Sequence, residues 1–195
     1  IFEAQSEVAA LTGRVLADGV HGHPYSEADA AAYIAGDRAP ERHWTEGNEQ
    51  RPQTSMYGCN MAFRDRVILN CRFEESLPLY GWQEDRDYTS QASAYGTTIT
   101  APPCRGVHLG SKSGRVSGLR FGYSQIANPI YMWRKGTMTG KVGLRFVVRH
   151  LLANSARSLQ SNAHTDYPGR LRGNLLALGD VVRGSCDPRR ILQLR

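Results

Sequence analysis

The chain of 195 residues contains four cysteines, and their spacing is uneven. They are separated by 12, 33 and 82 residues, which excludes a Cys-x-x-Cys redox motif and the common zinc spacings. We therefore expect reduced, buried thiols in a cytosolic protein. The four positions are Cys59, Cys71, Cys104 and Cys186.

The chain also lacks a long apolar run. Its most apolar stretch, residues 142–153, is interrupted by Arg145, Arg149 and His150, so the sequence predicts no membrane-spanning helix. No signal peptide is recognisable, and the first residue is Ile1, which is consistent with a fragment that begins inside a domain.

Lysine is scarce, although the chain is basic. The formal charge of +6 and the pI of about 9.4 favour an anionic partner such as a nucleotide phosphate, a lipid headgroup or nucleic acid. Nearly all of the excess is arginine, since lysine occurs only at positions 112, 135 and 141. No block of five like charges is present, so an ordinary solvated surface explains the excess equally well.

Apolar periodicity and turn residues predict an α/β protein. Residues 1–7 are typical of the end of a helix, and 8–16 of a strand. Ser26 and Asp29 form a capping-box pattern for a helix that Gly36 closes. The further predictions are a loop over 37–55, a strand over 55–63 with a bulge at Gly58, helices over 64–70 and 84–95, and two short strands over 97–110 separated by Pro102 and Pro103.

The character of the sequence changes from Gly114 onward. A helix is predicted over 141–160 and a last one over about 170–183. The apolar stripe predicted for the first of these comprises Val142, Phe146, Leu152, Ala156 and Leu159, flanked by Arg145, Arg149 and Arg157. Two interpretations of this basic amphipathic helix stay open: it packs on the domain, or it lies on an anionic membrane surface.

The stretch "LPLYGWQEDRDYTSQ" (77–91) places Glu84, Asp85 and Asp87 in the first turn of a predicted helix. Carboxylates there stabilise the positive end of the helix dipole, which is sufficient to explain them. A metal-binding Asp-x-Asp is excluded, because residues 85 and 87 of a helix point about 200° apart. A third interpretation, a catalytic carboxylate, depends on the neighbouring motifs.

Three motifs occur in order: "YGCNMAFR" (57–64), "RFEESLPLYGWQEDRDY" (72–88) and "GVHLG" (106–110). Together they resemble the inverting, family 2 type glycosyltransferases of the GT-A fold, over roughly residues 8–110. The resemblance implies a partial GT-A mixed sheet flanked by helices over 1–113 and a C-terminal helical extension over 114–195. It also implies that the nucleotide-binding β-α-β units and the Asp-x-Asp strand of that family precede this chain.

The resemblance implies roles for seven residues. Asp85 would be the general base on the acceptor hydroxyl, with Glu84 beside it, and His108 would ligate a divalent Mg²⁺ or Mn²⁺ ion or touch the diphosphate. Gln91 replaces an arginine that often contacts the substrate in this family. The remaining candidates for substrate binding are Gly58, Asn60 and Trp82.

Each of these residues also has a purely structural interpretation. His108 is equally consistent with a strand histidine that bonds a neighbour, Gly58 and Asn60 with a bulge, and Trp82 with a core residue. Two loop histidines spaced by two residues, His21 and His23, have no acidic partner nearby and indicate a polar loop rather than a second metal site.

The expected function is transfer of a sugar from a nucleotide-sugar donor, with inversion, to a glycan or a lipid-linked acceptor. The expected location is the cytoplasm, at the inner face of a membrane if the basic helix lies on lipid. A nucleic-acid-binding basic module and a non-catalytic scaffold derived from the same fold are the alternatives. The first lacks any recognisable RNP, KH, zinc or helix-turn-helix signature.

Overall fold

The computed structural model of the protein describes residues 1–20, 23–111, 116–159 and 165–195. The chain forms two compact units. The sheet unit comprises Ile1–Arg72 and Tyr88–Gly114, and the helical unit comprises Phe73–Asp87 and Arg115–Arg195. The predicted boundary between residues 113 and 114 lies beside the observed division after Gly114. The segment Phe73–Asp87, which we call the acidic stretch, belongs with the helices, although the chain on both sides of it belongs to the sheet unit.

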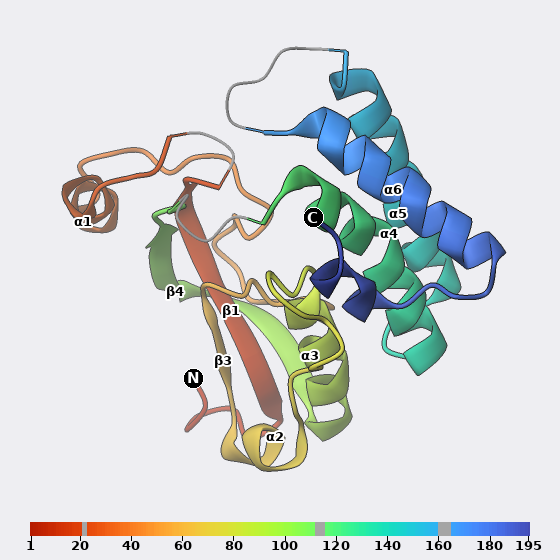
Figure 1. Ribbon diagram of the computed structural model, residues 1–195. Helices are drawn as coiled ribbons and strands as arrows, with labels where there is room; N and C mark the ends of the chain where they lie inside the picture. The colour runs from red at the N-terminus through yellow and green to blue at the C-terminus, as the bar shows by residue number, and fades with distance from the viewer. Residues whose placement is uncertain (21–22, 112–115, 160–164) are drawn as a thin grey trace. The chain divides into compact units, whose positions relative to one another are not determined.

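The sheet unit is built on two long parallel strands, β1 (Val8–Asp18) and β4 (Thr97–His108). Short antiparallel strands flank them, so that the order is β2-β4-β1-β3 (Figure 1). The short strands are β2 (Arg51–Pro52) and β3 (Met61–Phe63), and the helices α1 (Glu27–Ala35) and α2 (Asp65–Asn70) accompany the sheet. The predicted α/β class is confirmed at this level: a mixed sheet flanked by helices.

Strand β1 is the centre of the sheet unit, and nearly all of its residues are buried. Ala9 and Ala10 pack with Met56, Val67 and Tyr88. Val8 and Leu11 pack with Ile99 of β4 in a separate cluster. Burial on both sides explains the nearly continuous apolar run "VAALTGRVLA", which is typical of a central parallel strand.

The two strands predicted over 97–110 are in fact the single strand β4. Ala101 of β4 pairs with Gly13 of β1, and the next pair is Arg105 with Arg14. Residues 102–104 therefore have no register partner on β1. Proline has no N–H to donate to a neighbouring strand, and an irregularity of this kind removes the need for one. Pro102 and Pro103 therefore distort the strand without ending it.

In the N-terminal half, the structure confirms the predicted helix that Gly36 closes but not all of the other predicted local features. Helix α1 has the predicted capping box, with Asp29 N–H donating to the Ser26 side chain, and Gly36 ends it at φ 94°. Residues 1–7 form turns, so the predicted helix end there is wrong. The strand predicted over 55–63 is reduced to Met61–Phe63, and Gly58 lies in an exposed turn rather than at a bulge. Cys59 is also exposed, against the expectation of buried thiols.

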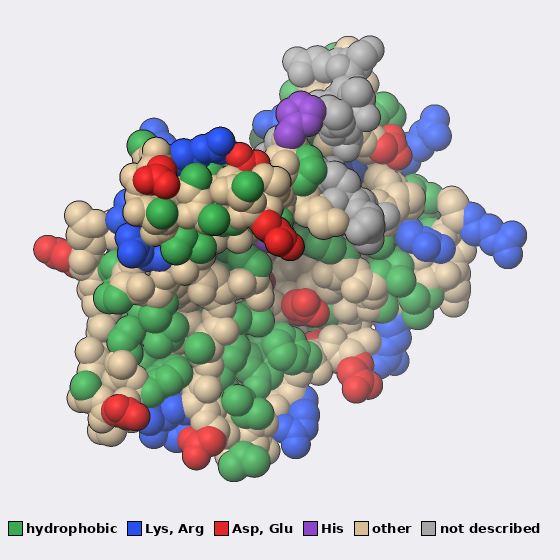
Figure 2. All heavy atoms as spheres, turned by 90° about the vertical axis from the view of Figure 1, so that its left-hand side faces the viewer, with side chains coloured by type: hydrophobic (Ala, Val, Ile, Leu, Met, Phe, Trp, Pro, Cys, Tyr) green, Lys and Arg blue, Asp and Glu red, His purple; other side chains and the backbone are tan. Residues whose placement is uncertain are grey.

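One face of the sheet unit carries mixed charge. On the face seen in Figure 2, acidic, basic and hydrophobic side chains are interspersed. Such mixing is what a solvated surface shows, and it matches the scatter of basic residues along the sequence. The sheet unit contains nine Lys or Arg and ten Asp or Glu residues, so the basic excess of the chain lies in the helical unit.

The helical unit contains α4 (Gly118–Lys135), α5 (Gly140–Arg157) and α6 (Tyr167–Val182), which lie side by side (Figure 1), and a short 3-10 helix, Pro188–Leu192. Helices α4 and α6 approach closely, since a Cβ on Gly122 would lie 2.0 Å from the Arg170 carbonyl oxygen and one on Gly173 would lie 2.1 Å from that of Leu119. Helix α4 was not predicted. Pro129 lies inside it, which argues against a helix from sequence alone.

A layer of polar side chains crosses the interior of the three-helix unit. Asn154 of α5 donates to Gln125 of α4 at 2.8 Å and to Asn174 of α6 at 2.7 Å. Asn174 in turn donates to the Gly122 carbonyl oxygen at 2.7 Å. Buried amides that satisfy one another in this way fix the register of the helices, because any slip leaves them unpaired.

Helix α5 does not present the predicted apolar stripe to the interior. Val142 and Phe146 are partly buried, but Leu152 is 64% exposed and Leu159 90% exposed. The buried positions are instead Gly143 and Asn154. Close packing at a glycine and an amide replaces part of the expected apolar contact. The sequence pattern therefore assigned Leu152 to the wrong side of the helix, and Leu159 lies in the turn after α5 ends at Arg157.

Lys135, at the end of α4, joins the acidic stretch to that helix. The Lys135 Nζ atom lies 2.8 Å from a carboxylate oxygen of Glu74 and 2.7 Å from one of Asp87, and the Asp87 side chain is fully buried. Thr137 also donates a hydrogen bond to Asp87. Burying a carboxylate is costly unless it is paired and hydrogen-bonded, so Lys135 is what permits Asp87 to lie inside the unit.

Acid should weaken this arrangement through Glu74. Burial opposes ionisation of Glu74, but hydrogen bonds from Lys135 and Ser76 outweigh it and lower its pKa to about 2. A folded-state pKa below the unfolded value gives stability that is present above about pH 4.5 and is lost as the pH falls toward 2. We expect Glu74→Gln to remove on the order of 2–3 kcal/mol at neutral pH and much less at pH 2, measured by denaturant unfolding across that range.

The adjacent exposed residue supplies the control for this experiment. Glu75→Gln removes one carboxylate of the same type at a position open to solvent, so it should leave the acid dependence of unfolding unchanged. Equal effects of the two substitutions at every pH would contradict the role assigned to Glu74.

Candidate functional site

The candidate site of the sheet unit lies where β1 and β4 end. Asp18 and His108 are the last residues of the two strands and are register partners. Because the strands are parallel, their carboxyl ends meet at one edge of the sheet, the usual place for ligands in α/β sheets. The backbone contact between the two strands continues just beyond Asp18, where the Gly19 N–H donates to the His108 carbonyl oxygen at 2.9 Å.

Glycine is required at this junction. Gly110 has φ 71°, and a Cβ there would lie 2.1 Å from the carbonyl carbon of Gly19. A side chain at either position would push the strand ends apart. The final glycine of the "GVHLG" motif thus has a structural reason of its own, independent of any ligand.

Asp18 collects hydrogen bonds from three directions. Tyr57 O–H donates to one carboxylate oxygen at 2.7 Å. The Nδ1 atom of His108 and the Val20 N–H each lie 2.9 Å from the other oxygen. The Asp18 side chain is only 16% exposed, so these contacts replace most of its hydration.

The same contacts determine which nitrogen of His108 carries the proton. Its Nδ1 faces Asp18 at 2.9 Å and the Tyr57 oxygen at 3.1 Å. Because the Tyr57 hydroxyl donates its hydrogen to Asp18, its oxygen can only accept from Nδ1, as the Asp18 oxygen does. Nδ1 must therefore be the donor. In the neutral ring, Nε2 then carries the lone pair, and it can accept a proton or bind a metal ion.

A second histidine approaches Asp18 from the loop after α1. The Nε2 atom of His43 lies 3.6 Å from the Asp18 carboxylate. Its Nδ1 accepts from the Thr45 N–H at 3.2 Å and faces the Thr45 hydroxyl at 2.7 Å. That hydroxyl accepts from the Val15 N–H at 2.9 Å, which leaves its hydrogen for His43 and places the other ring proton toward Asp18.

These contacts favour the ionised form of Asp18. Burial by itself raises the pKa of this carboxyl, but the hydrogen bonds from His43, Tyr57, the Val20 N–H and His108 outweigh burial and hold the pKa well below its usual range. Asp18 is therefore a fixed negative charge at neutral pH, beside two imidazoles.

Four of the predicted residues lie in the sheet unit, and only His108 is part of this cluster. Asn60 follows the turn that contains Gly58, and its main-chain oxygen accepts from the Thr12 hydroxyl at 2.7 Å. Its side chain lies against the backbone at Gly13 and Gly106, where the amide nitrogen is buried without a hydrogen-bond partner. The Gln91 amide donates to the Arg72 carbonyl oxygen at 3.1 Å. Asn60 and Gln91 thus have structural contacts within the unit.

The other predicted residues belong to the helical unit. Helix α3 (Glu84–Ala92) begins at Glu84, which is exposed, and Asp85 follows, partly exposed, with an oxygen accepting from the Arg86 N–H at 2.8 Å. Although the residue as a whole is exposed, the Glu84 carboxyl group lies against Gly81, and its desolvation and the negative charge of Asp85 raise the pKa of Glu84. A raised carboxyl pKa beside a second carboxylate is a feature that functional sites share with some structural clusters.

Trp82 lies in an aromatic cluster. Its ring is 4.8 Å from that of His150 and 5.6 Å from that of Phe146, and its carbonyl oxygen accepts from Asn128 at 2.8 Å. Burial, with smaller effects from the charges of Arg149 and Arg170, lowers the pKa of His150 to about 4, so this ring is neutral at pH 7. These contacts account for Trp82 as a packing residue before α3.

From the sequence, Asp87 is expected either on the solvated face of α3 or paired with a nearby arginine, and the structure shows neither. Asp87 is fully buried and pairs with Lys135. The first turn of α3 therefore contains two different kinds of aspartate: Asp85 is accessible to solvent, and Asp87 is enclosed and neutralised.

Asp18, His43 and Tyr57 are not among the site residues predicted from the sequence. One signal was available, because Asp18-Gly19 directly follows a buried strand, where polar residues at a carboxyl end often bind ligands. His43 and Tyr57 offered no comparable signal, because both lie in loops whose course cannot be predicted from the sequence. Of the two loop histidines discussed with the sequence, His21 lies outside the described residues.

The described residues contain no group of three or more His, Cys, Asp or Glu side chains placed to hold a metal ion. His108 nevertheless has the chemistry of a single metal ligand. A carboxylate that accepts the Nδ1 hydrogen, as Asp18 does, is the usual support behind a histidine whose Nε2 binds metal.

No protein-family model matches the chain, and no curated protein or solved structure is a match for it. The resemblance to the family 2 type glycosyltransferases therefore rests on the order and spacing of the three motifs. The geometry of the described residues is a separate observation.

Asp18→Asn should disturb the orientation of His108. An amide accepts at one atom only and presents N–H groups at the other, so it cannot accept from Tyr57, Val20 and His108 together. We expect the Nδ1-protonated fraction of His108 to fall and the free energy of unfolding to drop by about 1–3 kcal/mol. Nitrogen-15 NMR of the imidazole and denaturant unfolding measure the two effects, and Asp37→Asn at an exposed position is the matched control.

Proposed function

We propose that this chain is the acceptor-side part of an inverting, metal-dependent glycosyltransferase of the GT-A type. The complete enzyme would transfer a sugar from a nucleoside diphosphate donor to a hydroxyl of a glycan or a lipid-linked acceptor. The support is the ordered set of motifs together with the local geometry of two of their residues, Asp85 and His108.

The observation that carries the proposal is the difference in exposure among the three acids in the first turn of α3. Asp87 is withdrawn into the helical unit by Lys135, whereas Glu84 and Asp85 remain accessible to solvent. A structural anchor two residues after the proposed base fixes the helix start from which Asp85 projects. If the three acids only complemented the helix dipole, none of them would need to be buried or paired with a lysine.

Inverting transfer needs one base on the acceptor hydroxyl, which Asp85 would supply. As the hydroxyl oxygen bonds to the anomeric carbon, its proton passes to the Asp85 carboxylate and the bond to the diphosphate breaks. Glu84, with its raised pKa, is suited to a hydrogen bond with a neighbouring hydroxyl of the acceptor.

A divalent ion would neutralise the departing diphosphate. In the described part of the chain, His108 is the residue we assign to that group, with Nε2 as the ligand atom. Asp18 orients the ring by accepting its Nδ1 hydrogen, and the Tyr57 hydroxyl oxygen lies beside the same nitrogen. The remaining ligands would be phosphate oxygens and residues outside the described cluster.

Asp85→Asn tests the assignment of the base. The substitution preserves the size of the side chain but removes the proton acceptor, so turnover should fall by about 10² to 10⁴ while donor affinity stays nearly constant. Initial rates and donor titrations are measured on the protein expressed from its complete reading frame, over a panel of nucleotide sugars.

Asp87→Asn is the companion variant. It removes the charge that Lys135 and Thr137 bind inside the unit, while Lys135 keeps Glu74 and its access to solvent, so the free energy of unfolding should fall by about 1–3 kcal/mol. An Asn side chain can still accept from Lys135 or Thr137 and hold the helix start, so among the molecules that remain folded turnover should fall far less than in Asp85→Asn. Equal and small rate effects at both positions would rule out Asp85 as the base.

A further inference from the structure

Helix α5 has an outward side that is apolar and cationic at once. Leu144 is 64% exposed, Val148 45% and Leu152 64%. They follow one another at intervals of four residues, so they form a row along one side of the helix. The opposite side of α5, which includes Gly143 and Asn154, is buried against α4 and α6.

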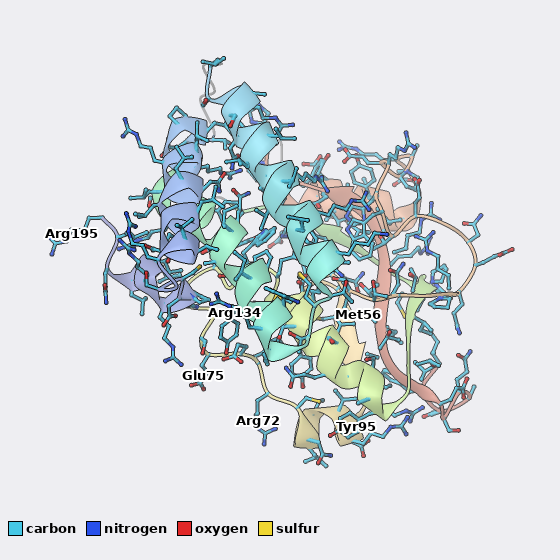
Figure 3. All side chains as sticks on the ribbon, turned by 90° about the vertical axis from the view of Figure 1, so that its right-hand side faces the viewer. Met56, Arg72, Glu75, Tyr95, Arg134 and Arg195 are labelled. Atoms are coloured by element: carbon cyan, nitrogen blue, oxygen red, sulfur yellow. The ribbon has the colours of Figure 1, made fainter. Side chains whose placement is uncertain are left out.

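Three cations lie among these apolar residues, also at intervals of four. We call this surface the outer face of α5; it comprises Lys141, Leu144, Arg145, Val148, Arg149 and Leu152, all of them exposed. The helix contains four basic residues and no aspartate or glutamate. No carboxylate of α5 therefore offsets the positive charge of its outer face. Figure 3 shows α5 and its side chains from this side of the molecule.

We propose that the outer face of α5 docks on the surface of an anionic lipid bilayer. The aliphatic side chains would enter the boundary between headgroups and acyl chains, and the three cations would remain at the level of the lipid phosphates. Long Lys and Arg side chains can reach the headgroups while their methylene groups stay in apolar surroundings. The helix would lie in the plane of the membrane, and no helix in the described part of the chain is long and apolar enough to cross it.

The pattern fits lipid better than the two other candidate occupants. A second copy of the chain, docked face to face, would bring Arg145 and Arg149 close to the same cations of its partner, which is repulsive. Nucleic acid would satisfy the cations, but single strands bind by stacking bases on aromatic rings. The exposed apolar residues of this face are aliphatic, and Trp133 beside its start is a single ring rather than a row on which successive bases could stack. Anionic lipid is the partner that uses both the charges and the aliphatic groups.

Trp133 provides an independent indication on the preceding helix. It is 55% exposed, and its indole nitrogen would lie 3.1 Å from a Cβ built on Gly140, the first residue of α5. Tryptophan favours the interface between membrane and water, where its ring is apolar and its N–H can reach a polar partner. Arg134, labelled in Figure 3, follows it in the last turn of α4. A Trp-Arg pair thus stands beside the start of the docking helix.

The test uses the chain described here and vesicles of defined composition. Vesicles of phosphatidylcholine alone are compared with vesicles that contain phosphatidylglycerol, at physiological salt, by co-sedimentation. We expect binding to the anionic vesicles, with affinity that falls as salt is added, and little binding to the neutral ones. Since no glycosyl transfer is measured, failure here would leave the proposed function untouched, and failure of that function would leave this result untouched.

Two triple variants separate charge from apolar contact. The change of Lys141, Arg145 and Arg149 to Gln should weaken binding by roughly a hundredfold, since each cation near an anionic surface contributes about a fivefold factor. The change of Leu144, Val148 and Leu152 to Ser should weaken it by at least about tenfold. All six positions are exposed, so circular dichroism and thermal unfolding should show intact helices.

A matched control removes the same net charge elsewhere. The change of Arg42, Arg172 and Arg195 to Gln affects three exposed positions outside α5 and should reduce vesicle binding far less than the α5 charge variant. Equal losses in these two variants would overturn the proposal in favour of non-specific attraction. Unchanged binding after the serine substitutions would also overturn it. So would tight binding of a poly-uridine oligonucleotide that depends on the α5 cations, with no binding of vesicles.

Discussion

The ion pairs of Lys135 are the interaction on which the acidic stretch depends. Phe73–Asp87 contains no strand and only the first turn of a helix, so it has little hydrogen-bonded structure of its own. Its position in the helical unit is fixed from both ends: Glu74 and Asp87 bind one lysine, and between them the Trp82 carbonyl accepts from Asn128. A single ammonium group that neutralises two carboxylates removes the largest electrostatic obstacle to enclosing this segment.

The sheet unit solves a similar problem with neutral donors. Asp18 is kept ionised by a tyrosine hydroxyl, a backbone N–H and two imidazoles, without lysine or arginine in the contacts described. Imidazoles can change their charge and orientation near neutral pH, whereas an arginine cannot. An aspartate supported in this way gives a histidine a defined orientation and leaves its outer nitrogen chemically active, which is the property that the proposed function requires of His108.

The sequence was informative wherever the signal is local. The capping box at Ser26, the apolar strand that became β1, and the helix start at Glu84 are each specified by residues within a few positions of one another. It failed where distant residues decide the outcome. Asp87 resembles any acid in a first helical turn until Lys135, 48 positions later, is brought to it. Likewise, Pro129 ordinarily ends a helix, and only the surroundings of α4 show that it does not do so here.

The path of the chain has a consequence for how this protein can be divided. Because Phe73–Asp87 belongs with the helices while its flanking sequence belongs with the sheet, the backbone passes between the two units three times. A cut after Gly114 would separate Lys135 from Glu74 and Asp87, leaving two acids selected for enclosure without their cation. The helical region is thus not a detachable appendage: recombination or truncation that exchanges it as a block would have to exchange the acidic stretch with it. Phe73–Asp87 and Arg115–Arg195 would therefore have to be exchanged together, although 27 residues of the sheet unit separate them in the sequence.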